Sequence, residues 1–253
     1  MEYTIAEEFT LPSLGKIYPV TVNPKIKLRS MTTAEEMKRL TPSETPLKTL
    51  CEIIDDCMVE PCAISSYDMC IGDYQFLQQK LRCVTYGSDY KLISTCPYCG
   101  SKNEAIVDLD KFDVITYSDD LDKYMEFDLP VSKKHITITY QTPRIIDNIN
   151  LRKREIAKKA GNAAEDQSVL LILKSIIKSI DNQPLNIITC DNFLRTLNMR
   201  DTNKILRNAD KLNNGIGLDI KLTYDNCKGC GLDYEYPFRI TGEFYGPSDD
   251  WGW

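Results

Sequence analysis

The pattern of hydrophobic and polar positions changes several times along the chain, which predicts a mixture of strands and helices. In the first thirty residues, VTVNPKIKLRS alternates with a period of two and follows the turn-forming run Pro12 to Gly15, so we expect an extended arm or hairpin. From Thr32 the spacing becomes helical, with Thr33 as the expected cap of a first helix and Pro46 at the start of a second. A third helix is expected from Asp73 to Tyr86.

The middle and the end of the chain repeat this change of period. A strand is expected before Cys96, a returning strand from Asn103 to Leu109, and two further strands in MEFDLP and HITITY. The segment Gly217 to Tyr224, GLDIKLTY, also has the strand period. Helical spacing covers four segments between these strands: Pro143 to Ala160, Ala163 to Ile180, about Asp191 to Met199 and Thr202 to Leu212.

These elements indicate an α+β protein in which a four-cysteine zinc ribbon is interrupted by a large α/β insertion. An N-terminal extended arm and a small helical domain precede the ribbon. The expected divisions are an N-terminal arm or hairpin (1–30), a helical domain (31–88), the first half of the ribbon (89–112), an inserted strand-then-helical domain (113–216), and the second half of the ribbon with a C-terminal tail (217–253).

The ribbon prediction rests on an internal repeat. The segments DYKLISTCPYCGSKNEAIVDL and DIKLTYDNCKGCGLDYEYPF each contain Asp-x-Lys-Leu, a Cys-x-x-Cys-Gly turn and an alternating strand that follows it. Two residues between the cysteines allow both sulfurs to reach one ion, and the glycine permits the left-handed backbone that such a tight turn, or knuckle, requires. The repeat therefore predicts two equivalent knuckles.

Two knuckles that face each other would supply four thiolates in a tetrahedron, which is the closed geometry of structural zinc sites. We therefore expect one structural Zn²⁺ per chain, with Cys96, Cys99, Cys227 and Cys230 as its ligands. The gap between Cys99 and Cys227 is far longer than the about 15–20 residues of a compact four-cysteine site, so an inserted domain must fill it.

A dithiol oxidoreductase is an alternative interpretation, because Cys-Pro-Tyr-Cys is also the active motif of glutaredoxins. In that case the first cysteine should cap a helix whose N-terminus lowers its pKa, and Cys96 should be a reactive thiolate. Gly100 and the strand-like NEAIVDL follow the motif instead. A redox motif also leaves Cys227 and Cys230 without a role.

Composition limits the remaining possibilities. The N-terminus is acidic and no apolar run follows it, and no stretch of about eighteen apolar residues occurs, so we expect neither a secretory signal nor a membrane span. The ten cysteines then belong in a reducing compartment, where paired cysteines bind metal or do redox work. A net charge of −6 argues against attraction of the whole molecule to nucleic-acid phosphates. The run from Leu151 to Lys159 is nevertheless basic and could contact nucleic acid. A nucleic-acid-associated zinc-ribbon protein is therefore a second alternative.

Other chemistry-bearing residues have ordinary interpretations. The six cysteines outside the repeat are expected to be small buried hydrophobic residues, and His135 is expected to face solvent. No Gly-rich phosphate loop, Gly-x-Ser-x-Gly or His-Glu-x-x-His occurs, so we expect no catalytic site and no small-molecule substrate. Trp251 and Trp253 end the chain after an acidic turn and form a candidate anchor for a partner protein.

The order of several short segments resembles the baseplate hub protein family of T-even-type contractile-tailed bacteriophages. These segments are FTLPSLGKIY, LRSMTTAEE, Leu81-Arg82, Thr85-Tyr86-Gly87 and the first Cys-Pro-Tyr-Cys-Gly. The resemblance covers about residues 1–115 and, more loosely, the second knuckle. It implies a non-enzymatic virion protein of the tail baseplate that is made in the host cytoplasm. Its partners would be other baseplate or tail proteins, in several copies around the tail axis.

Overall fold

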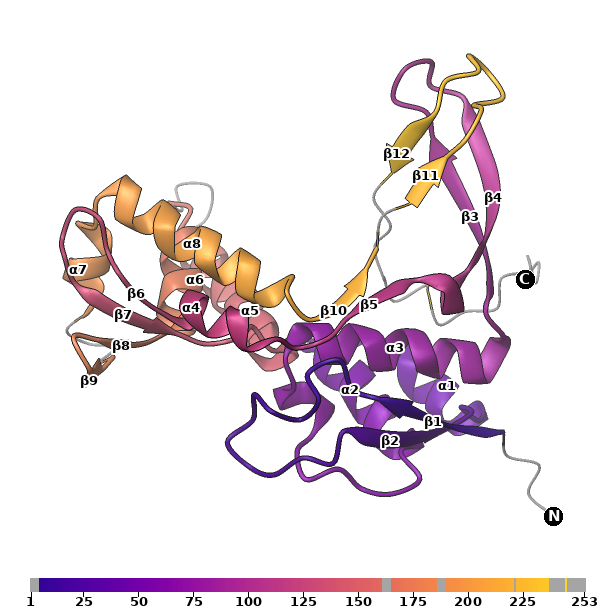
Figure 1. The fold of residues 1–253 in the computed structure, drawn as a ribbon, viewed down its shortest axis with the longest axis horizontal. Helices are drawn as coiled ribbons and strands as arrows, with labels where there is room; N and C mark the ends of the chain where they lie inside the picture. Colours follow the sequence, from indigo (N-terminus) through magenta and orange to yellow (C-terminus); the bar gives the residue numbers. More distant parts are fainter. Residues whose placement is uncertain (1–4, 161–164, 186–189, 221, 237–243, 245–253) are drawn as a thin grey trace.

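The computed structural model describes residues 5–160, 165–185, 190–220, 222–236 and 244. Two lobes lie side by side, and a narrow ribbon of strands stands out from them (Figure 1). The predicted anchor, Trp251 and Trp253, lies outside the described residues. No helix in these ranges is both long and apolar enough to span a membrane.

The N-terminal lobe combines a hairpin with three helices around one core. Strands β1 (Ala6–Thr10) and β2 (Lys25–Arg29) pair antiparallel, with Ala6 opposite Arg29. The helical elements are α1 (Thr33–Leu40), α2 (Pro46–Cys57), the 3-10 turn η1 (Ser66–Asp68) and α3 (Ile71–Tyr86). Leu11, Ile26 and Leu28 of the hairpin segment are buried in the same hydrophobic cluster as Ile54 and Leu77 of the helices. The hairpin therefore packs as part of the lobe.

The first helix begins one residue earlier than the sequence pattern suggested. Thr32, not Thr33, is the N-cap: its hydroxyl accepts a hydrogen bond from Ala34 N (3.3 Å), and its own N–H donates to the Glu35 carboxylate (2.7 Å). This reciprocal pair of bonds is a capping box between Thr32 and Glu35. Thr33 and Glu36 have the same spacing, so the sequence pattern alone did not distinguish the two threonines.

The ribbon consists of two hairpins that come from distant parts of the chain. Strand β3 (Asp89–Thr95) pairs with β4 (Lys102–Asp108), and β11 (Leu222–Tyr224) pairs with β12 (Tyr234–Tyr236), both antiparallel. Beneath the ribbon, η2 (Leu109–Lys111) leads to β5 (Asp113–Ile115). Leu109 and Phe244 form a buried cluster there, against Tyr90, Phe112, Ile220 and Leu222.

The predicted strand Gly217 to Tyr224 is divided into two strands with different partners. Its first part, β10 (Gly217–Asp219), pairs antiparallel with β5 at the base of the ribbon. Its last part, β11, belongs to the second hairpin of the ribbon. A continuous strand period does not reveal this change of partner, because each half alternates in the same way.

The second lobe packs helices against a four-stranded antiparallel sheet of order β6-β7-β8-β9 (Figure 1). The strands are β6 (Glu126–Asp128), β7 (His135–Ile138), β8 (Ile177–Ile180) and β9 (Gln183–Pro184). The helical elements are η3 (Asp119–Leu121), α4 (Asp122–Met125), α5 (Pro143–Ala160), α6 (Ser168–Ile176), α7 (Cys190–Arg195) and α8 (Met199–Asn213). The core is apolar and includes Ile136, Ile138, Ile176, Ile205 and Leu212.

The predicted helix from Ala163 to Ile180 is wrong at both ends. Residues 165–167 are not helical, and α6 begins at Ser168. Helix α6 ends at Ile176, and the next four residues form strand β8, in which Ile177 pairs with Ile138. The run of isoleucines fits either structure, because β-branched residues favour strands and their spacing also suits a helix face. These residues form a strand because they pair with β7. That strand lies far away in the sequence, so local spacing does not reveal the pairing.

Candidate metal centre

The four cysteines of the repeat meet at the outer end of the ribbon. Their sulfur atoms all lie within 4.8 Å of one another. Cys96 Sγ is 3.8 Å from Cys230 Sγ, and Cys99 Sγ is 3.6 Å from Cys227 Sγ, so each close pair joins the two knuckles. All four are free thiols, and Cys96 and Cys227 are buried while Cys99 and Cys230 are exposed.

The two knuckles have the same backbone conformation, as the repeat predicted. Gly100 and Gly231 both have φ of +73°, the left-handed conformation that glycine adopts without strain. The same two backbone hydrogen bonds close each turn: Cys96 N to Ser101 O (2.9 Å) and Gly100 N to Cys96 O (3.0 Å) in the first, and Cys227 N to Leu232 O (3.1 Å) and Gly231 N to Cys227 O (2.8 Å) in the second.

Gly229 allows the knuckles to approach each other closely. A Cβ atom at this position would overlap the Ser101 hydroxyl and lie 2.9 Å from Cys99 Sγ. A side chain at 229 would therefore push the second knuckle away from the first. Glycine at this position is needed for contact between the knuckles and not for a special backbone angle.

Asn103 on β4 connects the two knuckles and is completely buried. Its Nδ2 donates hydrogen bonds to Cys227 Sγ (3.3 Å) and Tyr234 Oη (3.0 Å), and its Oδ1 accepts one from Lys228 N (3.0 Å). Ser94 Oγ lies 2.6 Å from the same Tyr234 Oη. These side chains form a buried polar network directly behind the sulfur cluster.

The pKa values of the thiols differ because their surroundings differ. Burial acts to raise the pKa of Cys227, but N–H donors of Cys230, Gly229 and Asn103 outweigh it and lower this pKa to about 6. Hydrogen bonding with the Ser101 hydroxyl and N–H lowers the pKa of Cys99. For Cys230, the Leu232 N–H lowers the pKa, but burial and the three neighbouring sulfurs raise it to about 12. A cation among the sulfurs would favour the ionised form of all of them.

The donor set and its spacing fit a tetrahedral metal ion. Thiolates bind zinc at about 2.3 Å, so two ligands of a regular tetrahedron lie about 3.8 Å apart. The two close sulfur pairs, at 3.6 and 3.8 Å, agree with this value and exceed the length of a disulfide bond, and the other sulfur pairs lie within 4.8 Å. Four soft thiolate ligands suit zinc or iron and are a poor match for magnesium or calcium.

The dithiol interpretation lacks the helix that it requires. Cys96 follows strand β3, and the Cys-Pro-Tyr-Cys segment forms a turn that leads directly into β4. The N-terminus of a helix does not lie at this cysteine to lower its pKa. Each cysteine of the motif also faces a sulfur of the second knuckle, which is the arrangement of a ligand set.

The other residues singled out in the sequence lie away from this cluster. His135 is half-buried rather than fully solvent-facing, and its Nδ1 is 2.9 Å from Asp128 Oδ1 in the neighbouring strand. The basic residues Arg152, Lys153, Arg154, Lys158 and Lys159 are exposed on α5.

Among the remaining cysteines, Cys51, Cys57, Cys70 and Cys190 are buried, and Cys62 and Cys83 are intermediate.

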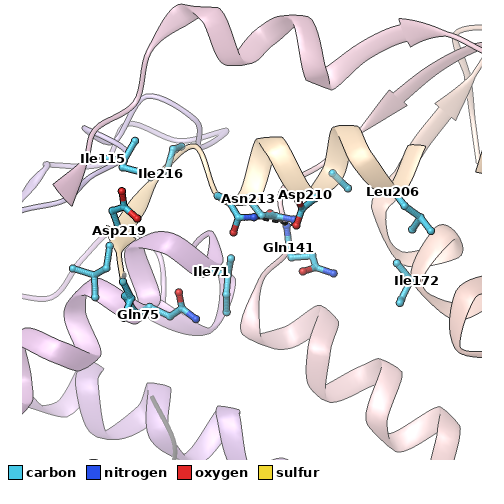
Figure 2. A pocket seen from close by; sticks show the side chains of 14 residues that line it. Ile71, Gln75, Ile115, Gln141, Ile172, Leu206, Asp210, Asn213, Ile216 and Asp219 are labelled. Atoms are coloured by element: carbon cyan, nitrogen blue, oxygen red, sulfur yellow. Dashed lines mark hydrogen bonds between the residues drawn. The ribbon is translucent and has the colours of Figure 1, made fainter. Parts of the chain in front are cut away.

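A hollow of 760 Å³ lies between α3, α8 and β10 (Figure 2). Apolar side chains such as Ile71 and Leu206 line it together with polar ones such as Gln75, Asp210 and Asn213. Two of the polar groups are engaged locally, since Asn213 Oδ1 accepts a hydrogen bond from Gln141 N (2.9 Å) and Asp210 accepts one from Asn214 (3.0 Å). No titratable cluster of the kind seen at the ribbon converges here among the described residues.

Asn103, Ser94 and Tyr234 belong to the site but were not among the residues predicted from the sequence. For Ser94 and Asn103, the alternation of the two strands contained information that could have identified them. They are paired across β3 and β4 and share the face of Tyr90 and Leu92, which is the inward face. Polar residues on the inward face of a strand require buried partners, and this requirement points to a polar network.

A family model described as T4 bacteriophage base plate protein matches residues 3–242, a range that includes both lobes and both knuckles. No curated protein and no solved structure matches the chain.

Proposed function

Because the chain belongs to the T4 bacteriophage base plate protein family, we propose that it is a structural, non-enzymatic component of a phage tail baseplate. It connects neighbouring baseplate proteins in the hub or wedge region of a contractile tail. The family match over residues 3–242 is the observation that carries this proposal. The two lobes and the projecting ribbon offer several separate surfaces for such contacts (Figure 1).

One structural zinc ion per chain stabilises the ribbon, with Cys96, Cys99, Cys227 and Cys230 as ligands. The sulfur separations and the two identical turns support this assignment. A site closed by four cysteines leaves no open position for water, so the ion has a structural role and not a hydrolytic one. Structural zinc contributes on the order of 10–16 kcal/mol of apparent binding free energy, comparable with the stability of a whole domain.

The metal fastens the C-terminal strands of the chain to its middle. In this proposal the ribbon is one unit made of residues 89–112 and 217–253, and residues 113–216 form an insertion between its halves. The pairing of β5 with β10 at the point where the chain leaves and re-enters the ribbon supports this division. Virion assembly in the host cytoplasm, with several copies around the tail axis, completes the proposal.

Native mass spectrometry of the purified full chain tests the metal and the assembly together. We expect one zinc per chain and defined complexes with purified baseplate proteins of the same phage. A chain that carries no metal and retains four free thiols would remove the zinc from the proposal. A chain that forms no complex with any baseplate protein would remove the connector role.

A nucleic-acid-associated ribbon protein is a second candidate, favoured by one observation: the exposed basic side chains on the C-terminal half of α5. Nucleic-acid binding through Arg152, Lys153 and Arg154 would weaken steeply as salt rises, because counterions are released on binding. Filter binding at two salt concentrations separates the candidates. Salt-sensitive binding that is lost on charge reversal of these residues favours the nucleic-acid role.

A further inference from the structure

We propose that Asn103 is the positioning residue of the metal centre, which orients the sulfur of Cys227 and docks the second knuckle onto the first. The proposal rests on the metal centre described above, because it concerns how this chain prepares that centre. Asn103 is not itself a ligand. It acts through Cys227 and through the backbone of the second knuckle.

The contacts of Asn103 reach both hairpins of the ribbon. It belongs to β4, next to the first knuckle, and its Nδ2 also lies 3.3 Å from Ser101 O within that hairpin. The same amide donates to Cys227 Sγ (3.3 Å), and its oxygen accepts from Lys228 N (3.0 Å) in the second knuckle. One side chain therefore holds a ligand and the backbone that follows it.

The repeat makes this role asymmetric. Asn103 lies four residues after Cys99, and the equivalent position after Cys230 is Tyr234. These two residues face each other across the ribbon and are joined by a hydrogen bond of 3.0 Å. Tyr234 has no side-chain amide to offer a sulfur, so the first hairpin positions the second and not the reverse.

The hydrogen bonds to Cys227 also change the character of its sulfur. Asn103 Nδ2 and Gly229 N (3.4 Å) both donate to it. An N–H donor stabilises the thiolate form and withdraws electron density from it. Partners of this kind set ligand orientation and metal affinity, and their loss typically costs about 10- to 100-fold in affinity.

Titration of the metal-free full chain with Co²⁺, in competition with a chelator, tests this role. Asn103→Leu should bind Co²⁺ about 10- to 100-fold more weakly than the unchanged protein. Its sulfur-to-cobalt charge-transfer band should also move to lower energy, because Cys227 has lost a donor. The band position is the decisive readout, since general loosening of the ribbon lowers affinity without changing the donors to a sulfur.

Ser94→Ala is the matched control, because Ser94 belongs to the same buried network and contacts Tyr234 rather than a sulfur. We expect its charge-transfer band to stay at the position of the unchanged protein. If Asn103→Leu fails to fold by circular dichroism, Asn103→Asp replaces it, since a carboxylate keeps the shape and cannot donate to Cys227. The same band shift is expected for this variant.

The outcomes separate this inference from the metal centre itself. An unchanged protein that binds neither Co²⁺ nor Zn²⁺ overturns the metal centre and this inference with it. An unchanged protein that binds Co²⁺, together with an Asn103 variant of equal affinity and identical band position, overturns only the role of Asn103. A band shift in Ser94→Ala as large as that in Asn103→Leu also overturns it.

Discussion

Gly217 packs directly against Gly72, so closely that a Cβ atom at position 217 would lie 2.7 Å from Gly72 Cα. Gly72 lies in the first turn of α3, and Gly217 opens β10, where the chain returns from the second lobe to the ribbon. A Cβ on Gly72 would in turn overlap the backbone of Ile216. This contact fixes where the base of the ribbon lies on the N-terminal lobe.

Gly72→Ala should destabilise the protein despite the position of Gly72 in a helix. Alanine in a helix is favoured over glycine by about 1 kcal/mol. The new Cβ would meet backbone atoms, which cannot rotate away, and overpacking of this kind costs about 1–3 kcal/mol. Urea unfolding followed by circular dichroism measures the net effect. A variant more stable than the unchanged protein would show that the contact is loose.

Gly217→Ala should lower the free energy of unfolding more than Gly87→Ala does. Both glycines have positive φ, +114° for Gly217 and +87° for Gly87, so alanine is strained at either position. Only Gly217 also has neighbours in the way, because a Cβ at Gly87 would have no atom within 4 Å. The same urea titration measures both variants. Equal losses of stability would mean that backbone strain alone accounts for the effect.

Asp147→Ala should detach the N-terminus of α2 from α5. Thr45, the N-cap residue of α2, makes no side-chain capping bond, and Asp147 Oδ2 accepts the hydrogen bond from Lys48 N (2.9 Å) instead. Loss of a helix cap costs about 0.5–2 kcal/mol. Asp68→Ala is the comparison, because it breaks an exposed ion pair with Arg144 worth about 0.2–1 kcal/mol. The prediction fails if thermal unfolding shows the larger loss for Asp68→Ala.

The sequence was sufficient for the features that depend on local spacing. The positions of Cys96 and Cys99, the glycine that follows them and the matching Cys227 and Cys230 are all short-range patterns, and their geometry follows from turn chemistry. That the two cysteine pairs lie together could be inferred because the repeat indicates that each pair is half of one four-cysteine metal site. The expected starts of α1, α2, α3, α5 and α7 lie within two residues of the observed ones, but α6 begins at Ser168 rather than Ala163, and α8 at Met199 rather than Thr202.

Features that depend on partners far away in the chain could not be inferred in this way. The contact of Asn103 with Cys227 joins residues 124 positions apart, and the cap that Asp147 provides for Lys48 joins residues 99 positions apart. Strand β8 formed where a helix was expected because β7 offers a pairing edge. In each case the deciding interaction is tertiary, and local preference gives no information about it.

The free energy of unfolding should fall in acid because protonation of Glu35 removes its interaction with Arg29. The hydrogen bond from Arg29 is the main cause that lowers the pKa of Glu35 to about 2, against an ordinary value of 4.5, and Thr32 adds to it. A carboxyl whose pKa is lowered by folding contributes stability above its ordinary pKa, and this contribution is lost as pH falls through the folded value. Glu35→Gln should flatten the stability profile between about pH 4.5 and 2.

Unfolding by urea across this pH range measures the slope for Glu35→Gln and for a partner variant, Arg29→Met. The partner variant should flatten the same interval, because Glu35 then loses the interaction that lowers its pKa in the folded state. A slope that survives in Glu35→Gln would assign the acid sensitivity to other carboxyl groups of the chain.

Deletion of residues 251–253 should weaken assembly and leave the isolated chain folded. The two tryptophans would contribute large aromatic contacts to a partner pocket, and such residues dominate binding energy at interfaces. Sedimentation of mixtures with purified baseplate proteins measures assembly, and circular dichroism checks the fold. Trp251→Phe with Trp253→Phe is the control, since it keeps the aromatic character. Unchanged assembly after the deletion would exclude the anchor.

Metal removal should release the second hairpin of the ribbon and spare the N-terminal lobe. Among the described residues, the cluster at the ribbon end has Cys96, Cys227 and Tyr234 as its buried hydrophobic residues, with Tyr224 and Tyr236 packed against them. This small cluster, together with Leu222 at the base, provides the apolar contacts of β11 and β12. The N-terminal lobe has its own extensive core, and none of the described ribbon residues belongs to it. A short two-stranded hairpin is at best marginally stable without such support.

Hydrogen exchange before and after chelation measures this local release. Amide hydrogen exchange in β11 and β12 should become fast on chelation, while the amides of α2 and α3 stay protected. Local opening depends on the contacts of each unit. Cys227→Ser should show fast amide exchange in β11 and β12 without chelator. Cys62 is a half-buried cysteine outside the cluster, so Cys62→Ser should retain the metal and slow exchange. Protection of β12 that persists in the metal-free chain would mean that the polar network of Asn103 and Tyr234 holds the ribbon closed without an ion.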